Sequence, residues 1–160
     1  MWKKIKPYVI SSVIALAVGG VSALLSRNGM DYYAQTVNKP SLSPPMWLFP
    51  VVWSILYILM GISSAIVFLN YEKKPIEGAV ALRIYGLQLV VNFFWSIIFF
   101  NLRNYLCAFI WLLLLMFLIV IMVLQFRKIS PVAAYLQIPY LLWVTFAGIL
   151  TWMVYMINQG

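Results

Sequence analysis

The sequence has no histidine, a single cysteine, Cys107, and only three acidic residues among 160. A disulfide within one chain needs two cysteines, structural zinc needs several cysteine and histidine ligands, and many haem sites use a histidine. A disulfide framework, a zinc site and a histidine-ligated haem are therefore excluded within one chain. We expect neither a metal site nor a resident cofactor.

The three acidic residues, Asp31, Glu72 and Glu77, lie outside the long apolar runs, in segments expected to be loops. A proton-coupled exporter is expected to carry a carboxylate inside the membrane. The shortage therefore argues against a compact multidrug exporter and against ion-coupled chemistry within the bilayer.

What the chain has in abundance is apolar surface. Hydrophobic residues make up 65% of it and charged residues 9%, with a mean hydropathy of +0.98. No soluble domain of this size could bury so much apolar surface, and a spanning helix needs roughly 20 apolar residues. The sequence therefore predicts an all-α integral membrane bundle of five transmembrane helices, a single domain over residues 1–160. The helices are predicted at about 8–26, 46–69, 80–101, 105–126 and 132–157.

The formal net charge of +8 would suggest a nucleic-acid partner in a soluble protein. Here the basic residues lie at the ends of the predicted helices, so their position is more informative than their sum, and no nucleic acid is expected. On the side of the N-terminus lie Lys3, Lys4, Lys6, Lys73, Lys74, Arg83, Arg127 and Lys128, and on the other side Arg27, Lys39 and Arg103. This positive-inside bias predicts a cytoplasmic N-terminus and an outward C-terminus, in the plasma membrane if the cell is bacterial.

The first apolar run resembles a signal peptide, because lysines precede it and Ala15–Leu16–Ala17 resembles a cleavage site. The run continues to Leu25, which is too long for a typical signal core. We therefore interpret it as a retained transmembrane helix.

The second predicted helix carries an aromatic face. Pro44 and Pro45 end a loop and open the uncharged run, because proline is well suited to a helix start. Trp53 and Tyr57 are then four residues apart, so their rings lie one above the other on a single face. Such a face can hold a flat molecule.

Two further helices carry stripes that combine polar and aromatic residues. Pro139 is expected to kink the last helix and to open space in the bundle. Amides inside a bilayer need hydrogen-bond partners, so the stripe of the third helix is expected to face the protein interior. There Gln88 either forms a hydrogen bond between packed helices or belongs to the ligand site. The stripes consist of Gln88, Asn92 and Trp95 in the third helix and of Trp143, Ala147 and Thr151 in the fifth.

These stripes predict a ligand pocket in the outer half of the membrane, between the first, second, third and fifth helices. Trp53 and Trp143 lie too deep for an interfacial aromatic belt. We expect the segment 27–45, which includes Tyr32, to form a lid rather than a solvated linker, and Ala23 of the first helix to complete the wall. Such a pocket suits a large, flat, mostly apolar ligand, and Arg27, Lys39 and Arg103 could meet acidic groups at its edge.

Small residues recur at the four-residue spacing that allows close helix contact, as in Gly19 with Ala23 and Gly61 with Ala65. Both packing inside the bundle and a homodimer interface fit this spacing, and the sequence leaves the choice open.

Together these residues resemble the tryptophan-rich sensory protein or translocator protein family, also called the peripheral-type benzodiazepine receptors. The resemblance covers essentially the whole chain. It rests on Pro44–Pro45 with Trp47, Phe49, Trp53, Leu56–Tyr57 and Met60–Gly61, on Asn92 with Trp95, and on Pro139–Tyr140 with Trp143 and Ala147.

The resemblance implies a membrane receptor, sensor or translocator that binds porphyrins such as protoporphyrin IX, sterols and benzodiazepine-type compounds, often as a homodimer. The family's ligand positions fall on Trp53, Asn92, Trp95, Trp143 and Ala147. The sterol segment of the animal members has a basic residue after its tyrosine, whereas Tyr155 here is followed by none, which leaves porphyrin as the better expectation.

The alternative is a light- and oxygen-dependent porphyrin-degrading enzyme. Indole is readily oxidised, so the catalytic residues in that case would be Trp53 and Trp143, with the bound ligand supplying the reactive state. A purely structural membrane protein is less consistent with deep tryptophans beside an amide-lined stripe.

Overall fold

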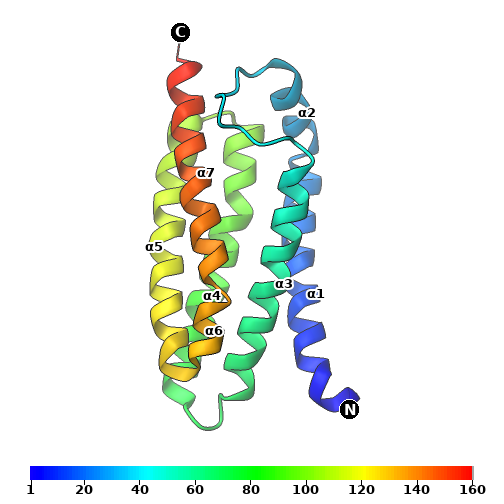
Figure 1. Ribbon diagram of the computed structural model, residues 1–160, viewed down its shortest axis with the longest axis vertical. Coiled ribbons are helices and arrows are strands. Elements are labelled where there is room, and N and C mark those ends of the chain that lie inside the picture. The colour runs from blue at the N-terminus through cyan, green and yellow to red at the C-terminus, as the bar shows by residue number, and fades with distance from the viewer. Residues whose placement is uncertain (160) are drawn as a thin grey trace.

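The computed structural model describes residues 1–159, and they form a bundle of helices (Figure 1). Five segments are long and apolar enough to cross a membrane, namely Trp2–Leu25, Leu48–Leu69, Pro75–Asn101, Tyr105–Ile129 and Pro131–Ile157. The elements are α1 (Trp2–Leu25), α2 (Arg27–Thr36), α3 (Leu48–Leu69), α4 (Pro75–Ser96), the π-helix η1 (Ile97–Asn101), α5 (Tyr105–Ile129), α6 (Pro131–Tyr135) and α7 (Ile138–Ile157). The predicted all-α fold class with five membrane helices is confirmed.

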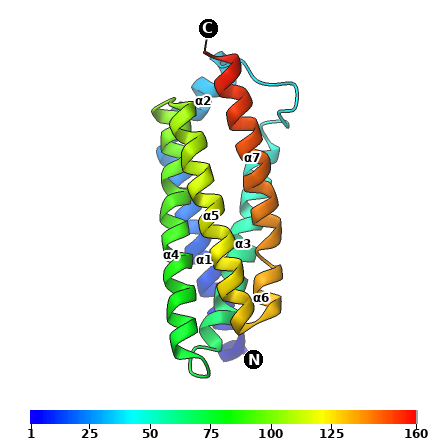
Figure 2. The same ribbon diagram turned by 90° about the vertical axis from the view of Figure 1, so that its left-hand side faces the viewer.

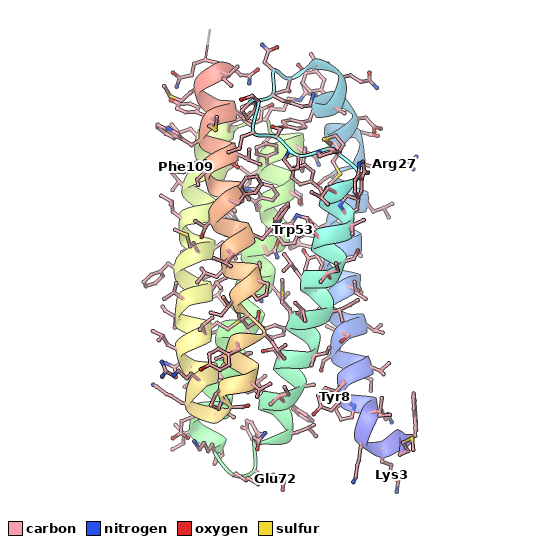
Figure 3. All side chains as sticks on the ribbon, viewed as in Figure 1. Lys3, Tyr8, Arg27, Trp53, Glu72 and Phe109 are labelled. Atoms are coloured by element: carbon pink, nitrogen blue, oxygen red, sulfur yellow. The ribbon has the colours of Figure 1, made fainter. Side chains whose placement is uncertain are left out.

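Helices α1, α3, α4 and α5 pack side by side along most of the bundle, and α7 lies against α5 (Figures 1 and 2). The N-terminus lies at one end, beside the α3–α4 turn. The C-terminus lies at the other, beside α2, and we call this the lid end. Lys3 and Glu72 lie at the N-terminal end and Arg27 at the lid end, as Figure 3 shows.

The N-terminal half of the bundle is held by close contacts between backbones. A Cβ atom on Gly61 would lie 2.3 Å from Ser12 Cα of α1, so only glycine fits this crossing. Ser63 Oγ donates to the carbonyl oxygen of Ala133 in α6 over 2.6 Å. Gly61 and Ala65 are both buried, which shows that this small-residue pair packs within the bundle.

The last transmembrane segment is interrupted rather than kinked. The sequence predicted one helix over 132–157 with a bend at Pro139, but α6 ends at Tyr135 and α7 begins at Ile138. Pro139 lies in the first turn of α7, where the missing N–H leaves no intrahelical bond unmade. The lower piece, α6, packs against both α5 and α3, whereas α7 packs mainly against α5.

Three other boundaries differ from the prediction. Helix α1 begins at Trp2 rather than near residue 8, so the lysines lie on its first turns. The segment 27–45 is not loop throughout, because its first ten residues form α2. The third transmembrane segment begins at Pro75, since proline suits the first turn, and closes with the wider turn of η1.

Candidate ligand-binding site

A cavity of about 290 Å³ lies inside the lid half of the bundle, between α1, α2, α3, the α4–η1 segment and α7. Its walls are mainly apolar side chains and aromatic rings. Trp53 lies in this half, in the interior of the bundle (Figure 3). The full lining consists of Gly19, Ala23, Met30, Tyr33, Met46, Phe49, Pro50, Trp53, Tyr57, Asn92, Trp95, Ser96, Phe99, Phe100, Ala147, Leu150, Thr151 and Val154.

Stacked rings form one wall of the cavity. Trp53 stacks on Tyr57 with ring centroids 5.6 Å apart and an interplanar angle of 30°, as the four-residue spacing on α3 predicts. Trp95 of α4 lies 6.5 Å from Trp53 at a similar tilt of 32°. Gly19 of α1 leaves room for this arrangement, because a Cβ there would lie 2.1 Å from the Tyr57 ring. The wall offers flat π-faces to a ligand.

The floor of the cavity, formed by Asn92 and Tyr57, is polar. Tyr57 Oη donates to Asn92 Oδ1 over 3.4 Å. Asn92 Nδ2 in turn donates to Tyr140 Oη over 2.9 Å, and the Tyr140 hydroxyl donates to Gln88 Oε1 over 2.8 Å. Amides and hydroxyls buried in a membrane protein are expected to pair in this way, and the pairing holds Asn92 in one place.

The π-helix η1 adds two rings to the wall that the sequence analysis missed. Phe99 stacks on Trp95 with centroids 5.2 Å apart and an angle of 28°, and Phe100 meets Trp95 edge to face at 6.1 Å. A π-turn inserts one extra residue, which changes the helical register of everything after it. Phe99 and Phe100 follow Asn92 at i+7 and i+8, so ordinary helical spacing would also place both rings on the face of Asn92 and Trp95, but the sequence analysis ended this stripe at Trp95.

The segment 27–45 covers the cavity through α2. Met30 and Tyr33 of α2 line it, and Gly29 allows α2 to approach η1, because a Cβ at Gly29 would lie 2.5 Å from the Phe100 carbonyl oxygen. Burial raises the pKa of Tyr33 to about 12, so this phenol stays neutral at ordinary pH.

Two contacts fasten this cover at its far end. Asn158, which follows α7, accepts from the Asn38 backbone N–H over 3.2 Å and donates to the Asn38 carbonyl oxygen over 2.9 Å. Lys39 Nζ donates to the Ala34 carbonyl oxygen over 2.8 Å, at the C-terminal end of α2. These contacts hold the segment after α2 to the C-terminal end of α2 and to the residue that follows α7.

Two of the three basic residues expected to meet a ligand are engaged with protein groups. Lys39 satisfies the carbonyl end of α2 and lies 5.3 Å from the Tyr33 ring centroid. The Arg103 guanidinium lies 3.6 Å over the Tyr32 ring, from a left-handed backbone conformation with φ of 55°. Arg27 remains as the cation at the lid end for which no such contact is found within residues 1–159.

Most of the site residues named from sequence lie together at the cavity. Those that line it are Ala23, Trp53, Tyr57, Asn92, Trp95, Ala147 and Thr151. Three others do not line it, each for a different reason. Gln88 lies beneath the floor, where it accepts a hydrogen bond from Tyr140. Tyr32 packs under the Arg103 guanidinium, and its neighbour Tyr33 lines the cavity in its place.

Trp143 is the third residue outside the cavity lining. It packs edge to face against Phe49, with centroids 5.8 Å apart, and against Phe146 at 5.5 Å. Phe49 lines the cavity and therefore stands between it and the Trp143 indole. Trp143, Ala147 and Thr151 all lie within α7, so the interruption does not separate them, and it is Phe49 of α3 that keeps Trp143 from the cavity.

A second hollow of about 370 Å³ lies on the outside of the bundle, between α5 and α7. Phe109, Met116, Thr145, Gly148 and Trp152 are among its lining residues. The Thr145 hydroxyl donates to the Leu141 carbonyl oxygen of its own helix over 2.8 Å. This face offers apolar surface and no polar floor comparable to that of the central cavity.

Comparison with known proteins adds to this geometry. Residues 11–156 match the model of the TspO/MBR family. The chain is 36% identical over 158 residues to the tryptophan-rich protein TspO of Chlorobaculum tepidum, which covers 99% of each chain. It is 35% identical over 148 residues to protein CrtK of Rhodobacter capsulatus, covering 92% and 90% of the two chains. It is 31% identical over 159 residues to the translocator protein of Homo sapiens, covering 99% and 92%.

Proposed function

Because this chain belongs to the TspO/MBR family, we propose that it is a membrane sensor or translocator that binds a flat tetrapyrrole such as protoporphyrin IX in the central cavity. The single observation that carries this proposal is the aromatic wall. Trp53, Tyr57 and Trp95 present roughly parallel rings next to a floor with only two polar side chains, and such a surface selects planar apolar ligands.

A whole porphyrin is larger than the cavity of about 290 Å³, so binding requires the cover to move or part of the ring to stay in the mouth. The carboxylates of a porphyrin are costly to bury, which favours the orientation in which they remain at the lid end. Arg27 lies at that end and supplies the complementary charge (Figure 3).

We further propose that the lid end faces outward and the N-terminus the cytoplasm. The bias of eight basic residues to three supports this orientation, since in the structure the N-terminus and the α3–α4 turn lie at the same end of the bundle (Figure 1). The homodimer stays a prediction. The Gly61–Ala65 pair is already used inside the bundle, so a second copy would need another face.

The proposal is tested by titrating the purified protein with protoporphyrin IX in the dark and following the quenching of tryptophan fluorescence. Ala147 and Gly148 are neighbours on α7 that face different hollows, which makes them a matched pair. Ala147→Leu fills the central cavity and should weaken binding at least about tenfold, since a filled site excludes the ligand. Gly148→Leu, where nothing lies within 4 Å of a Cβ, should leave the affinity unchanged.

Two results would contradict the proposal. Absence of saturable binding would show that the cavity has a different ligand. Loss of binding in Gly148→Leu but not in Ala147→Leu would move the site to the hollow between α5 and α7.

A repeat of the titration under light tests the degrading enzyme. The structure favours Trp53, which lines the cavity, over Trp143, which Phe49 separates from it. Protein-dependent bleaching of the porphyrin that is lost in Trp53→Phe and kept in Trp143→Phe would support this alternative, and absorbance that survives illumination would support a sensor or carrier.

A further inference from the structure

Beneath the floor, hydrogen bonds lead from Asn92 through Tyr140 and Gln88 to the sulfur of Met60. Gln88 Nε2 lies 4.0 Å from Met60 Sδ, and Gln88 Oε1 accepts from Tyr140. Met60 and Gln88 are fully buried and Tyr140 is 1% exposed, and none of the three lines the cavity. They act on a ligand only through Asn92.

The sulfur at the end of this relay decides the direction of each hydrogen bond in it. A thioether accepts a weak hydrogen bond and has no proton to donate. Gln88 therefore keeps its NH₂ group toward Met60, because the opposite orientation would leave its buried carbonyl oxygen against the sulfur with no donor. The Gln88 carbonyl oxygen then faces Tyr140, whose single proton it takes, so Tyr140 must accept from Asn92.

The consequence at the cavity floor is that Asn92 turns its carbonyl oxygen, not its NH₂ group, toward the ligand. The Tyr57 hydroxyl donates to this oxygen over 3.4 Å, a long bond that leaves acceptor capacity on both atoms. The indole nitrogen of Trp95, the donor nearest in sequence, is covered by protein atoms. The floor therefore offers hydrogen-bond acceptors to a ligand at the Asn92 and Tyr57 oxygens.

We propose that Met60, Gln88 and Tyr140 are positioning residues that orient the Asn92 amide, so that the cavity prefers planar apolar ligands carrying an N–H or O–H donor over ligands of the same shape without one. The inference rests on the proposed function and adds a selection rule to it. Aromatic stacking accepts almost any flat ring, whereas an oriented acceptor discriminates between them.

Carbazole and fluorene test this rule, because they share one tricyclic outline and differ in an N–H against a CH₂ group. Their dissociation constants for the full chain in detergent micelles are measured by equilibrium dialysis against protein-free micelles. We expect carbazole to bind about fivefold more tightly than fluorene, the effect of one net hydrogen bond. In Tyr140→Phe the Asn92 amide loses its hydrogen-bond partner, so the ratio of the fluorene dissociation constant to the carbazole dissociation constant should fall toward one.

A matched control and a second variant complete the experiment. Tyr85→Phe removes a hydroxyl that is also buried in the bundle but makes none of the relay's hydrogen bonds, so the ratio should stay that of the wild type. Met60→Leu keeps the side-chain volume but removes the acceptor, so both orientations of Gln88 become populated and the ratio should fall by about half. Thermal unfolding of each variant reports whether it has folded.

The outcomes separate this inference from the proposed function. Equal affinities for the two probes in the wild type, or an unchanged ratio in folded Tyr140→Phe, would overturn the inference while the cavity remains a site for flat ligands. Binding of neither probe would overturn both. If Tyr140→Phe does not fold, the ratio in Met60→Leu decides, and an unchanged value there overturns the inference.

Discussion

The two halves of this bundle use opposite means to set the distance between helices. In the N-terminal half, Gly61 brings the backbones of α1 and α3 together and Ser63 joins α3 to α6 by a buried hydrogen bond. In the lid half, the rings of Trp53, Trp95 and Phe99 lie between the helices and hold them apart. Small residues let the helices of the N-terminal half come into contact, and large aromatic rings keep the helices of the lid half apart.

This difference divides two tasks between the halves. Helices in direct contact gain dispersion energy and leave no room for a ligand, so the N-terminal half stabilises the fold. Side chains that line a cavity forgo part of that energy and offer faces to a ligand in return. The relay from Met60 to Asn92 runs between the halves and connects the packed interior to the cavity floor.

The largest effect is expected where the closed half is forced open. Gly61→Val places a side chain where a Cβ would already lie 2.3 Å from the Ser12 backbone, so α1 and α3 must separate. We expect the free energy of unfolding to fall by about 3 kcal/mol, the upper part of the usual range for overpacking. Thermal unfolding in detergent measures this change.

Gly20→Val is the control for that substitution, because Gly20 also lies in this helix pair, on α1, and nothing lies within 4 Å of a Cβ at that position. Its stability should remain close to that of the wild type. Equal destabilisation by both substitutions would show that the α1–α3 contact does not set the stability of this half.

A smaller effect is expected when the hydrogen bonds that hold the cover over the cavity are removed. Asn158→Ala removes both side-chain hydrogen bonds to the Asn38 backbone, so the cover should open more often. We expect ligand dissociation to become about fivefold faster, in line with the net value of one exposed pair of hydrogen bonds, with little change in thermal stability. Stopped-flow quenching of tryptophan fluorescence measures the rate.

Gln159→Ala, at the exposed neighbouring position, serves as the reference for this rate. If both variants release ligand at the wild-type rate, the tie between residues 38 and 158 does not control access to the cavity.

The smallest effect is the contribution of Tyr33, in the cover, to the pH dependence of the free energy of unfolding. Burial raises the pKa of Tyr33 to about 12 from an ordinary value of 10.0, so the unfolded chain releases this proton first. The stabilising contribution of Tyr33 is complete below pH 10 and is lost as the pH rises toward 12. The free energy of unfolding should therefore decline over this window more steeply in the wild type than in Tyr33→Phe, as measured by chemical unfolding at each pH.

Much of this molecule followed from hydrophobic runs and helical spacing. Apolar stretches of sufficient length indicated five spans, because a chain in lipid must satisfy its own backbone. The four-residue steps from Trp53 to Tyr57 and from Gln88 to Asn92 placed those side chains correctly, since they lie within regular α-helix. The wall of Trp53, Tyr57 and Trp95 was accessible to this reasoning.

Only the tertiary structure decided the features that depend on contacts between segments distant in sequence. Phe49 of α3 covers Trp143, the last span divides into α6 and α7, and α2 forms within the expected loop and presents Tyr33 to the cavity in place of Tyr32. Periodicity predicts a face only while the rise and turn per residue stay constant. It does not say which side chain of another helix will cover a given face, because that is set by the packing of helices distant in sequence.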